Sequence, residues 1–585
     1  MSTTSNRLRV ACARSLVGAL AVAAFTFGGV SLSAQGTGLP PEAGPRGTFG
    51  IPGVRISGNT EITGEAYGAS GIDNRRPGSS WRVAMRPTIT LFGELSASMD
   101  LLLTNEGNEF RQNVNQVGLH PKWRWMTLHL GDFSQPMTPY TVQGVRVRGA
   151  GVDMRPGLFR FSLQGGRTQR PVFAGSQGTV FQRNLVAATV GFGREGGSFL
   201  DLNVVKARDD ITRRELALLI IDSTFIDTLP GGAFRPQIGT RPQENLVAGL
   251  TGQLNLFRRA LSVKGEVAAA LVTNDLTAPL IADSALTGPA SALGDFQDVR
   301  LSTSGDFAYN LEATANVKRV RLRSAYEYVG PGYTSLGLAY LIGDRRALAF
   351  DGSWQVPGDR IVLQGNLRRM GDNLLGQRTF TTARDTYGGG LMLRLTQSLT
   401  GSVNVMNNVV TNDAVVDTFA VDVRALAVTS SLSSQQQILG LRTVVSVAHA
   451  FQNSVDGNTI LGVPDVKAQN VSLSLQLFLT ERFSVTPSFA AVTSELVGQP
   501  KNRNVQLGFR ASGSLFENSL RLQAAVTNAR TTQGRDVNAV NASATWDLPG
   551  DVRMNLAMRA SRYAAFGPQV AFQEQVATLS FARSW

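Results

Sequence analysis

Arginine is the residue type in this sequence whose spacing best suggests chemistry. Ten arginines occupy the polar positions of segments in which every second residue is apolar, so we expect them to share the polar face of a β-strand. Several guanidinium groups around a pore favour anions, because arginine is always protonated and offers a planar fork of donors. The candidate anion-binding residues are Arg321, Arg323, Arg368, Arg394, Arg424, Arg442, Arg510, Arg521, Arg553 and Arg559.

Candidates for catalysis or metal binding are poor. The histidines, His120, His129 and His449, do not have the spacing of a metal site. His129 is an odd number of residues from both Asp132 and Ser134, so in a strand it would face away from them. The sequence contains neither a Gly-x-Ser-x-Gly elbow nor a phosphate-binding Gly-Lys-Ser/Thr loop. We therefore expect no enzymatic activity, no bound metal and no cofactor.

The first residues have the pattern of a secretory leader. Basic residues precede an apolar stretch at 16–30, and small residues lead to a plausible cleavage site after Ala34. We expect residues 1–34 to be a cleaved signal peptide and residues 35–53 to form a short periplasmic tail. Cys12 is the only cysteine and lies in the leader, so the mature chain would contain neither disulfides nor cysteine-zinc sites.

The net charge also limits the partners. Removal of three leader arginines lowers the formal charge from +13 to +10, which in an exported chain suits anionic lipid or an anionic solute and argues against nucleic acid. The arginine excess has a second interpretation. A charge facing lipid costs roughly 2–4 kcal/mol at mid-membrane, so arginines should face inward whatever the function. There they would pair with acids such as Glu266, Glu312 and Asp422, or meet lipopolysaccharide near a rim.

The elements that carry these arginines are predicted strands. In residues 471–479 every odd position is apolar, whereas Ser472, Ser474 and Gln476 occupy the other face. The longer segments of this kind match the about 9–11 residues that a tilted strand needs to cross a bilayer. After the leader there is no stretch of about 18 apolar residues, which excludes a helical membrane protein.

The connections between these segments alternate in length along the chain. Short turns, as at 317–319 and 549–551, alternate with long polar connections, of which the longest lie at about 207–243 and 274–305. Alternating short turns and long loops are typical of outer-membrane barrels, with the turns in the periplasm. We predict an all-β, transmembrane, antiparallel up-and-down barrel of about 24–26 strands over residues 54–585, located in the bacterial outer membrane.

The final segment, 576–585, supports this interpretation. Leu579, Phe581 and Trp585 share one face, and a terminal aromatic on an alternating last strand resembles the signal that the barrel-assembly machinery recognises. Arg583 departs from that pattern, because the position two before the end is usually apolar or aromatic.

The segment 131–161 is the most distinctive part of the chain. A Pro-Tyr connection ending at Tyr140 leads into a Gly-rich strand, and a Pro-Gly turn precedes Phe-Arg-Phe. It resembles a stretch of large, porin-like outer-membrane barrel proteins of Bacteroidota-type and Gemmatimonadota-type bacteria. The resemblance implies a fold and a location but no active residues. The prolines exclude a central strand, so the connection forms either a corner or a segment inside the lumen.

We therefore predict a porin-like channel through which small solutes, preferably anions, pass. Its expected partners are outer-membrane lipid, lipopolysaccharide, the barrel-assembly machinery and the solutes. One alternative is a structural or secretion-associated barrel filled by a plugging lipoprotein, and another is an adhesin-like surface barrel. A gated receptor with its own plug would need a much longer segment before the first strand than residues 35–53.

Overall fold

The structure is a computed structural model that describes residues 53–105, 114–175, 178–194, 196–210, 226–228, 234–236, 241–281, 296–458, 460 and 465–585. The predicted signal peptide, residues 1–34, lies outside the described residues, and so does all but the last residue of the predicted periplasmic tail. Most of the connection at 207–243 and the middle of the connection at 274–305 also lie outside them.

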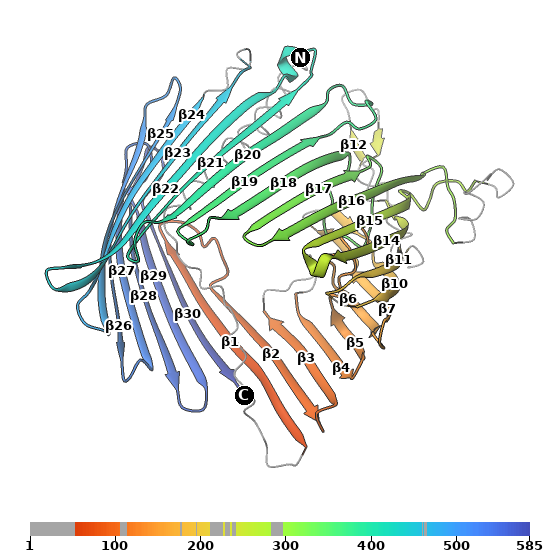
Figure 1. Cartoon of the computed structure of the whole chain (residues 1–585), viewed down its shortest axis with the longest axis horizontal. Helices are drawn as coiled ribbons and strands as arrows, with labels where there is room; N and C mark the ends of the chain where they lie inside the picture. Colours follow the sequence, from red (N-terminus) through yellow and green to blue (C-terminus); the bar gives the residue numbers. More distant parts are fainter. Residues whose placement is uncertain are drawn as a thin grey trace.

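The chain forms one closed antiparallel sheet of 26 strands (Figure 1). The barrel closes because β1 (Val54–Ser70) pairs with β2 (Ser79–Leu91) on one side and with the last strand, β30 (Phe572–Ser584), on the other. Every other barrel strand pairs with the barrel strands before and after it along the chain. The prediction of an up-and-down barrel of 24–26 strands is confirmed.

The remaining barrel strands have these bounds: β3 Leu95–Thr104, β4 Gln116–Trp123, β5 Met126–Phe133, β6 Val147–Met154, β7 Phe159–Gln169, β10 Arg183–Gly193, β11 Phe199–Asp209, β14 Glu244–Leu256, β15 Leu261–Thr273, β16 Thr303–Val317, β17 Val320–Val329, β18 Arg345–Gln355, β19 Ile361–Gly371, β20 Thr382–Arg394, β21 Leu399–Asn412, β22 Asp422–Ile438, β23 Leu441–Asp456, β24 Val466–Phe478, β25 Phe483–Leu496, β26 Asn502–Leu515, β27 Leu520–Thr531, β28 Val537–Leu548 and β29 Val552–Tyr563. Two small hairpins, β8 (Val172–Gly175) with β9 (Gly178–Val180) and β12 (Ile226–Thr228) with β13 (Phe234–Pro236), and the 3-10 turns η1 (Phe257–Arg259) and η3 (Asp417–Phe419) lie in connections.

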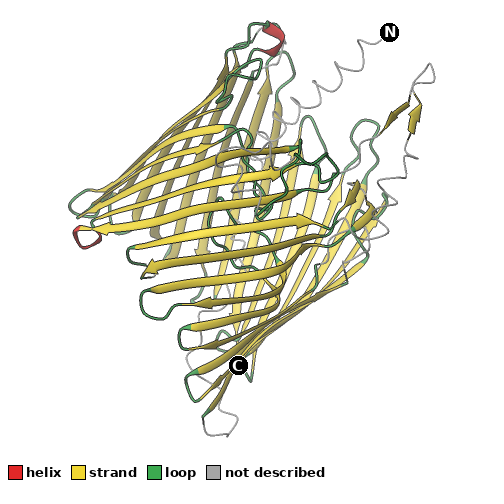
Figure 2. Ribbon diagram, turned by 90° about the vertical axis from the view of Figure 1, so that its right-hand side faces the viewer, coloured by secondary structure: helices red, strands yellow, loops and turns green. Residues whose placement is uncertain are grey.

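Short turns gather at one end of the barrel and long connections at the other, and the wall between them consists of strands (Figure 2). Tight antiparallel turns need residues with positive φ, and the turns supply them at Lys318 (φ 51°), Gly550 (φ 82°) and Asp551 (φ 58°). The usual orientation of such barrels places these turns in the periplasm.

The two faces of the wall differ in chemistry. In β24 the side chains of Val471 and Leu473 are exposed on the outside, and the cross-strand neighbours of Leu473 are Val447 and Phe489. Ser472 and the other even-numbered residues of β24 face the lumen. A closed sheet with an apolar outer face leaves no backbone group unpaired in lipid, so the chain is a bacterial outer-membrane β-barrel. Within the described residues, we find no helix of the length and apolarity that a membrane span requires.

Candidate functional site in the barrel lumen

Nine of the ten candidate arginines face the lumen. Side chains of residues paired across two strands point to the same side of the sheet. Once the lumenal side chains of one strand are known, the pairing therefore identifies those of the next strand. In β17, Arg321 and Arg323 alternate with Leu322, which is exposed on the outer face. The nine inward arginines are Arg321, Arg323, Arg368, Arg394, Arg442, Arg510, Arg521, Arg553 and Arg559.

Arg424 is the exception, and its predicted inward placement is wrong. It pairs with Val409 and shares the outer face of β22 with Leu426, next to the long-connection end of the barrel. There it contacts Asp422 at 3.1 Å, so this acid also lies on the outer face. The sequence pattern is misleading here, because Val423 and the residues two positions before and after it are apolar too. Both faces of this part of the strand are therefore apolar in sequence, and the pattern does not identify the one that faces lipid.

Several inward arginines are held by acids. Arg323 contacts Glu312 at 2.9 Å and Asp351 at 2.8 Å, and these two carboxylates more than offset its charge. Asp547 accepts from Arg553 at 2.6 Å and also pairs with Arg521. The alternative interpretation of the arginine excess, pairing with lumenal acids, therefore holds for part of the set.

Two further arginines make weaker contacts, and four make none within the described residues. The guanidinium of Arg442 lies 4.9 Å from the ring centroid of Phe478, and Arg559 donates to the Ser561 hydroxyl at 3.3 Å. In the part of the chain that the structure describes, neither a hydrogen bond nor an ion pair involves the side chains of Arg321, Arg368, Arg394 or Arg510.

Lumenal charge is unevenly distributed around the barrel. From β19 to β29 eight arginines and two acids face inward, whereas from β1 to β18 ten basic and eleven acidic residues do. The first set is Arg368, Arg384, Arg394, Arg442, Arg510, Arg521, Arg553 and Arg559 with Asp456 and Asp547. The second is Arg55, Arg82, Arg86, Lys122, Arg160, Arg183, Lys264, Arg321, Arg323 and Arg345 with Glu61, Glu65, Asp100, Asp153, Asp201, Asp209, Glu266, Asp306, Glu312, Glu327 and Asp351. We call the β19–β29 part the basic wall.

Sequence analysis did not select Arg384, which belongs to the basic wall. Its neighbours in sequence are Ala383 and Asp385, so a small residue and an acid occupy the other face. The local sequence therefore does not indicate which face of this part of the strand meets lipid. The pairing of Arg384 with Met370 of β19 places it inward.

Two long connections fold into the lumen and form what we call the inner layer, residues 134–146 and 330–344. Tyr140 and Val142 of the first are each only 1% exposed. Together with Tyr333 of the second they belong to one cluster of buried side chains that includes Val205 and Val247 on the lumenal face of the wall. The predicted Pro-Tyr connection therefore lies inside the barrel, which was one of its two interpretations.

Hydrogen bonds join the two connections to each other. Tyr333 donates its hydroxyl to the Tyr140 carbonyl at 2.8 Å, and Ser335 donates to the Thr141 carbonyl at 2.6 Å. The Gln143 amide donates to the Gly337 carbonyl at 3.0 Å. Burial raises the pKa of Tyr333 and of Tyr140 far above the ordinary value, so both phenols stay neutral.

The wall also holds the inner layer through a buried side-chain amide. Asn245 of β14 donates to the Thr334 carbonyl at 2.9 Å and accepts from the Leu336 amide at 3.1 Å. Sequence analysis did not anticipate the connection 330–344 as a partner of 134–146, because no local pattern records a contact between residues so far apart in the chain.

Two of the three histidines lie side by side, and the third, His449, lies on the outer face of β23. His120 and His129 face the lumen with their Nδ1 atoms 3.0 Å apart, and His120 Nε2 lies 3.3 Å from Asp100. Ser134 donates to a backbone carbonyl, and Asp132 pairs with an arginine. Among the described residues we find no group of three or more His, Cys, Asp or Glu side chains able to hold a metal ion.

The last strand carries the predicted assembly signal. Leu579 and Phe581 are exposed on the outer face of β30, and Arg583 shares that face. Trp585 exchanges backbone hydrogen bonds of 2.7 and 3.0 Å with Gly58 of β1, at the seam where the barrel closes. Recognition of this strand by the assembly machinery stays a prediction.

No family model and no curated protein matches this sequence. Among solved structures the chain is similar to the ferric-catecholate import receptor Fiu of E. coli, with 9% identity over 90% of this chain and 81% of that chain and a TM-score of 0.37. It is also similar to OpdK of Pseudomonas aeruginosa, solved with vanillate, with 10% identity over 59% of this chain and 93% of that chain and a TM-score of 0.30. These similarities are too distant to transfer an activity or a ligand.

Proposed function

We propose that this barrel is an outer-membrane channel through which small solutes diffuse, with anions favoured over cations. The observation that supports the proposal is the basic wall, where eight arginines face the lumen against two acids. An excess of one sign along a pore raises the local concentration of the opposite ion and lowers the barrier to its entry.

The position of the inner layer determines which part of the lumenal wall a solute meets. Residues 134–146 and 330–344 pack against the lumenal side of strands β10 to β17, which carry none of the arginines of the basic wall. Solutes then pass on the side of the arginines, and the arginines without partners set the selectivity, because they keep their full charge.

A bilayer experiment tests the proposal. The purified barrel is inserted singly into a planar membrane, and the reversal potential is measured across a tenfold KCl gradient, for which perfect selectivity corresponds to about 59 mV. We expect steady conductance and a potential of the anion sign. A triple variant, Arg368→Gln with Arg394→Gln and Arg510→Gln, should at least halve that potential. These arginines are chosen because their removal leaves no acid unpaired in the described structure.

Arg424→Gln is the matched control. It removes the same charge from the outer face, so the reversal potential should not change. A cation-favouring potential, or an equal effect of the control and the triple variant, would refute the anion preference. An inserted barrel that stays closed would contradict the channel itself and favour a barrel filled by a partner lipoprotein.

A further inference from the structure

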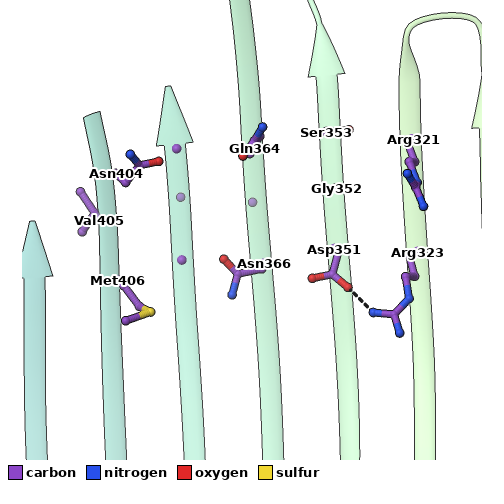
Figure 3. Close-up of a pocket in the computed structure, with 14 residues that line it drawn as sticks. Arg321, Arg323, Asp351, Gly352, Ser353, Gln364, Asn366, Asn404, Val405 and Met406 are labelled. Atoms are coloured by element: carbon purple, nitrogen blue, oxygen red, sulfur yellow. Dashed lines mark hydrogen bonds and ion pairs between the residues drawn. The ribbon is translucent and has the colours of Figure 1, made fainter. Parts of the chain in front are cut away.

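A hollow with several polar side chains lies in the lumenal wall where β17 to β21 run side by side (Figure 3). Its volume is about 590 Å³. Five lumen-facing polar side chains define what we call the recess: Arg321, Ser353, Gln364, Asn366 and Asn404. They come from β17, β18, β19 and β21, and the strand between the last two, β20, contributes only glycines to the lining.

Glycines of β20 allow two asparagines to converge. Asn366 reaches over β20 from one side and Asn404 from the other, as Figure 3 shows. A Cβ on Gly388 would overlap the Asn366 side-chain oxygen, and a Cβ on Gly390 would lie 2.6 Å from the Asn404 side-chain oxygen. Both amides can therefore occupy these positions only because the residues opposite them carry no side chain.

The polar groups of the recess are not used by the protein itself. Among the described residues, no hydrogen bond or ion pair involves the side chains of Arg321, Gln364, Asn366 or Asn404. The next row of the same wall differs, because Thr386 there donates its hydroxyl to a neighbouring asparagine at 2.7 Å. The donors and acceptors of the recess are free for a solute.

The recess also carries one charged side chain without an ion-pair partner among the described residues, Arg321. Arg323 is next to Arg321 on the same face but is paired with two carboxylates at 2.8 and 2.9 Å. Arg321 keeps its charge and its planar fork of donors, which fits a carboxylate in a bidentate geometry. Side-chain amides both donate and accept, which suits hydroxyl groups.

We propose that the recess binds small hydroxylated carboxylates of the sugar-acid class as they pass through the lumen. Arg321 takes the carboxylate, while Gln364, Asn366 and Asn404 take the hydroxyls. Two strand spacings, roughly 10 Å, separate Arg321 from Gln364 along one row, a gap that one hexuronate bridges once the side chains reach inward. This inference rests on the proposed function and names a substrate class for the channel.

Binding in detergent tests the inference without requiring conduction. The purified barrel is titrated calorimetrically with galacturonate, with galactose, which lacks the carboxylate, and with acetate, which lacks the hydroxyls. Galacturonate should bind about tenfold more tightly than either. Arg321→Gln should remove about that tenfold advantage for galacturonate and leave galactose unchanged.

A matched glycine pair tests the amides. Gly388→Ala should displace Asn366 and weaken both galacturonate and galactose severalfold. Gly389→Ala is the control, because the neighbouring Gly389 faces outward and a Cβ there would meet only a carbonyl oxygen at 3.9 Å. Heat-modifiable migration in gels confirms that each variant is a folded barrel.

The outcomes separate this inference from the channel proposal. Equal binding of the three probes, or equal effects of Gly388→Ala and Gly389→Ala, would overturn the recess even if the barrel conducts anions. Selective galacturonate binding by a barrel that does not conduct would support the recess and refute the channel.

Discussion

Replacing Tyr140 by alanine removes the largest fully buried side chain of the inner layer. The tyrosine is 1% exposed and packs in the cluster that joins residues 134–146 to the wall. Truncation of a buried aromatic residue to alanine costs about 3–5 kcal/mol, and each 1.36 kcal/mol is a factor of ten. If the connection opens locally while the barrel stays closed, the open population should increase about 100-fold or more.

Hydrogen exchange measures this opening directly. The Gln143 amide donates to Gly337 and the Ala339 amide donates to Gln143 at 3.1 Å, so both report on the joint between the two connections. In Tyr140→Ala their exchange should accelerate about 100-fold, whereas amides of the barrel strands should keep their protection. Tyr340→Ala is the matched control, because Tyr340 lies in the same inner layer but is 78% exposed. Unchanged exchange in Tyr140→Ala, or equal acceleration in the control, would refute packing as the force that holds the layer.

Three further outcomes are expected. Gly149→Val should prevent β6 from pairing with β7, because a Cβ there would overlap a backbone carbonyl of β7. The variant should therefore lose the heat-modifiable migration of a folded barrel. Gly68→Ala should keep this migration, because Gly68 has open space around it. Asp547→Asn should release two arginines from their shared acid and shift the reversal potential further toward anions. Because burial raises the pKa of Tyr333 above the unfolded value of 10.0, its contribution to stability is complete below about pH 10 and is lost as the pH rises further. Protease cleavage within residues 134–146 should therefore increase above about pH 10, and less steeply in Tyr333→Phe.

The sequence predicts the barrel well where the two faces of a strand differ. In residues 471–477 of β24 every second residue is a large apolar one and the alternate residues are polar, so both the strand and its orientation follow from the pattern. In β22 the pattern fails, because Val423 and Leu426 on opposite faces are both apolar, and Arg424 was assigned to the wrong face. The pairing of β22 with β21 shows which face of β22 meets lipid. The sequence of β22 alone does not contain this information.

The contacts of the lumen are harder to predict, because they join distant segments. Nothing near Tyr140 in sequence indicates that Tyr333 donates to its carbonyl, and nothing near Asn366 indicates that Gly388 leaves room for it. Glycines in the middle of β20 do give an indication in the sequence. Glycine weakens a strand, so several glycines within one strand suggest that another group lies close to its backbone.

Apolar residues on the lumenal face point to a covering segment. In β11, Leu202 and Val204 face lipid, yet Val205 and Ala207 face the lumen and are fully buried. An aliphatic side chain of valine size gains about 1.5–3 kcal/mol from burial, a gain that a water-filled lumen cannot supply. A strand that is apolar on both faces within an otherwise alternating barrel should therefore have another segment packed against its inner side. Here that segment is the inner layer, which packs against the lumenal side chains of β10 to β17.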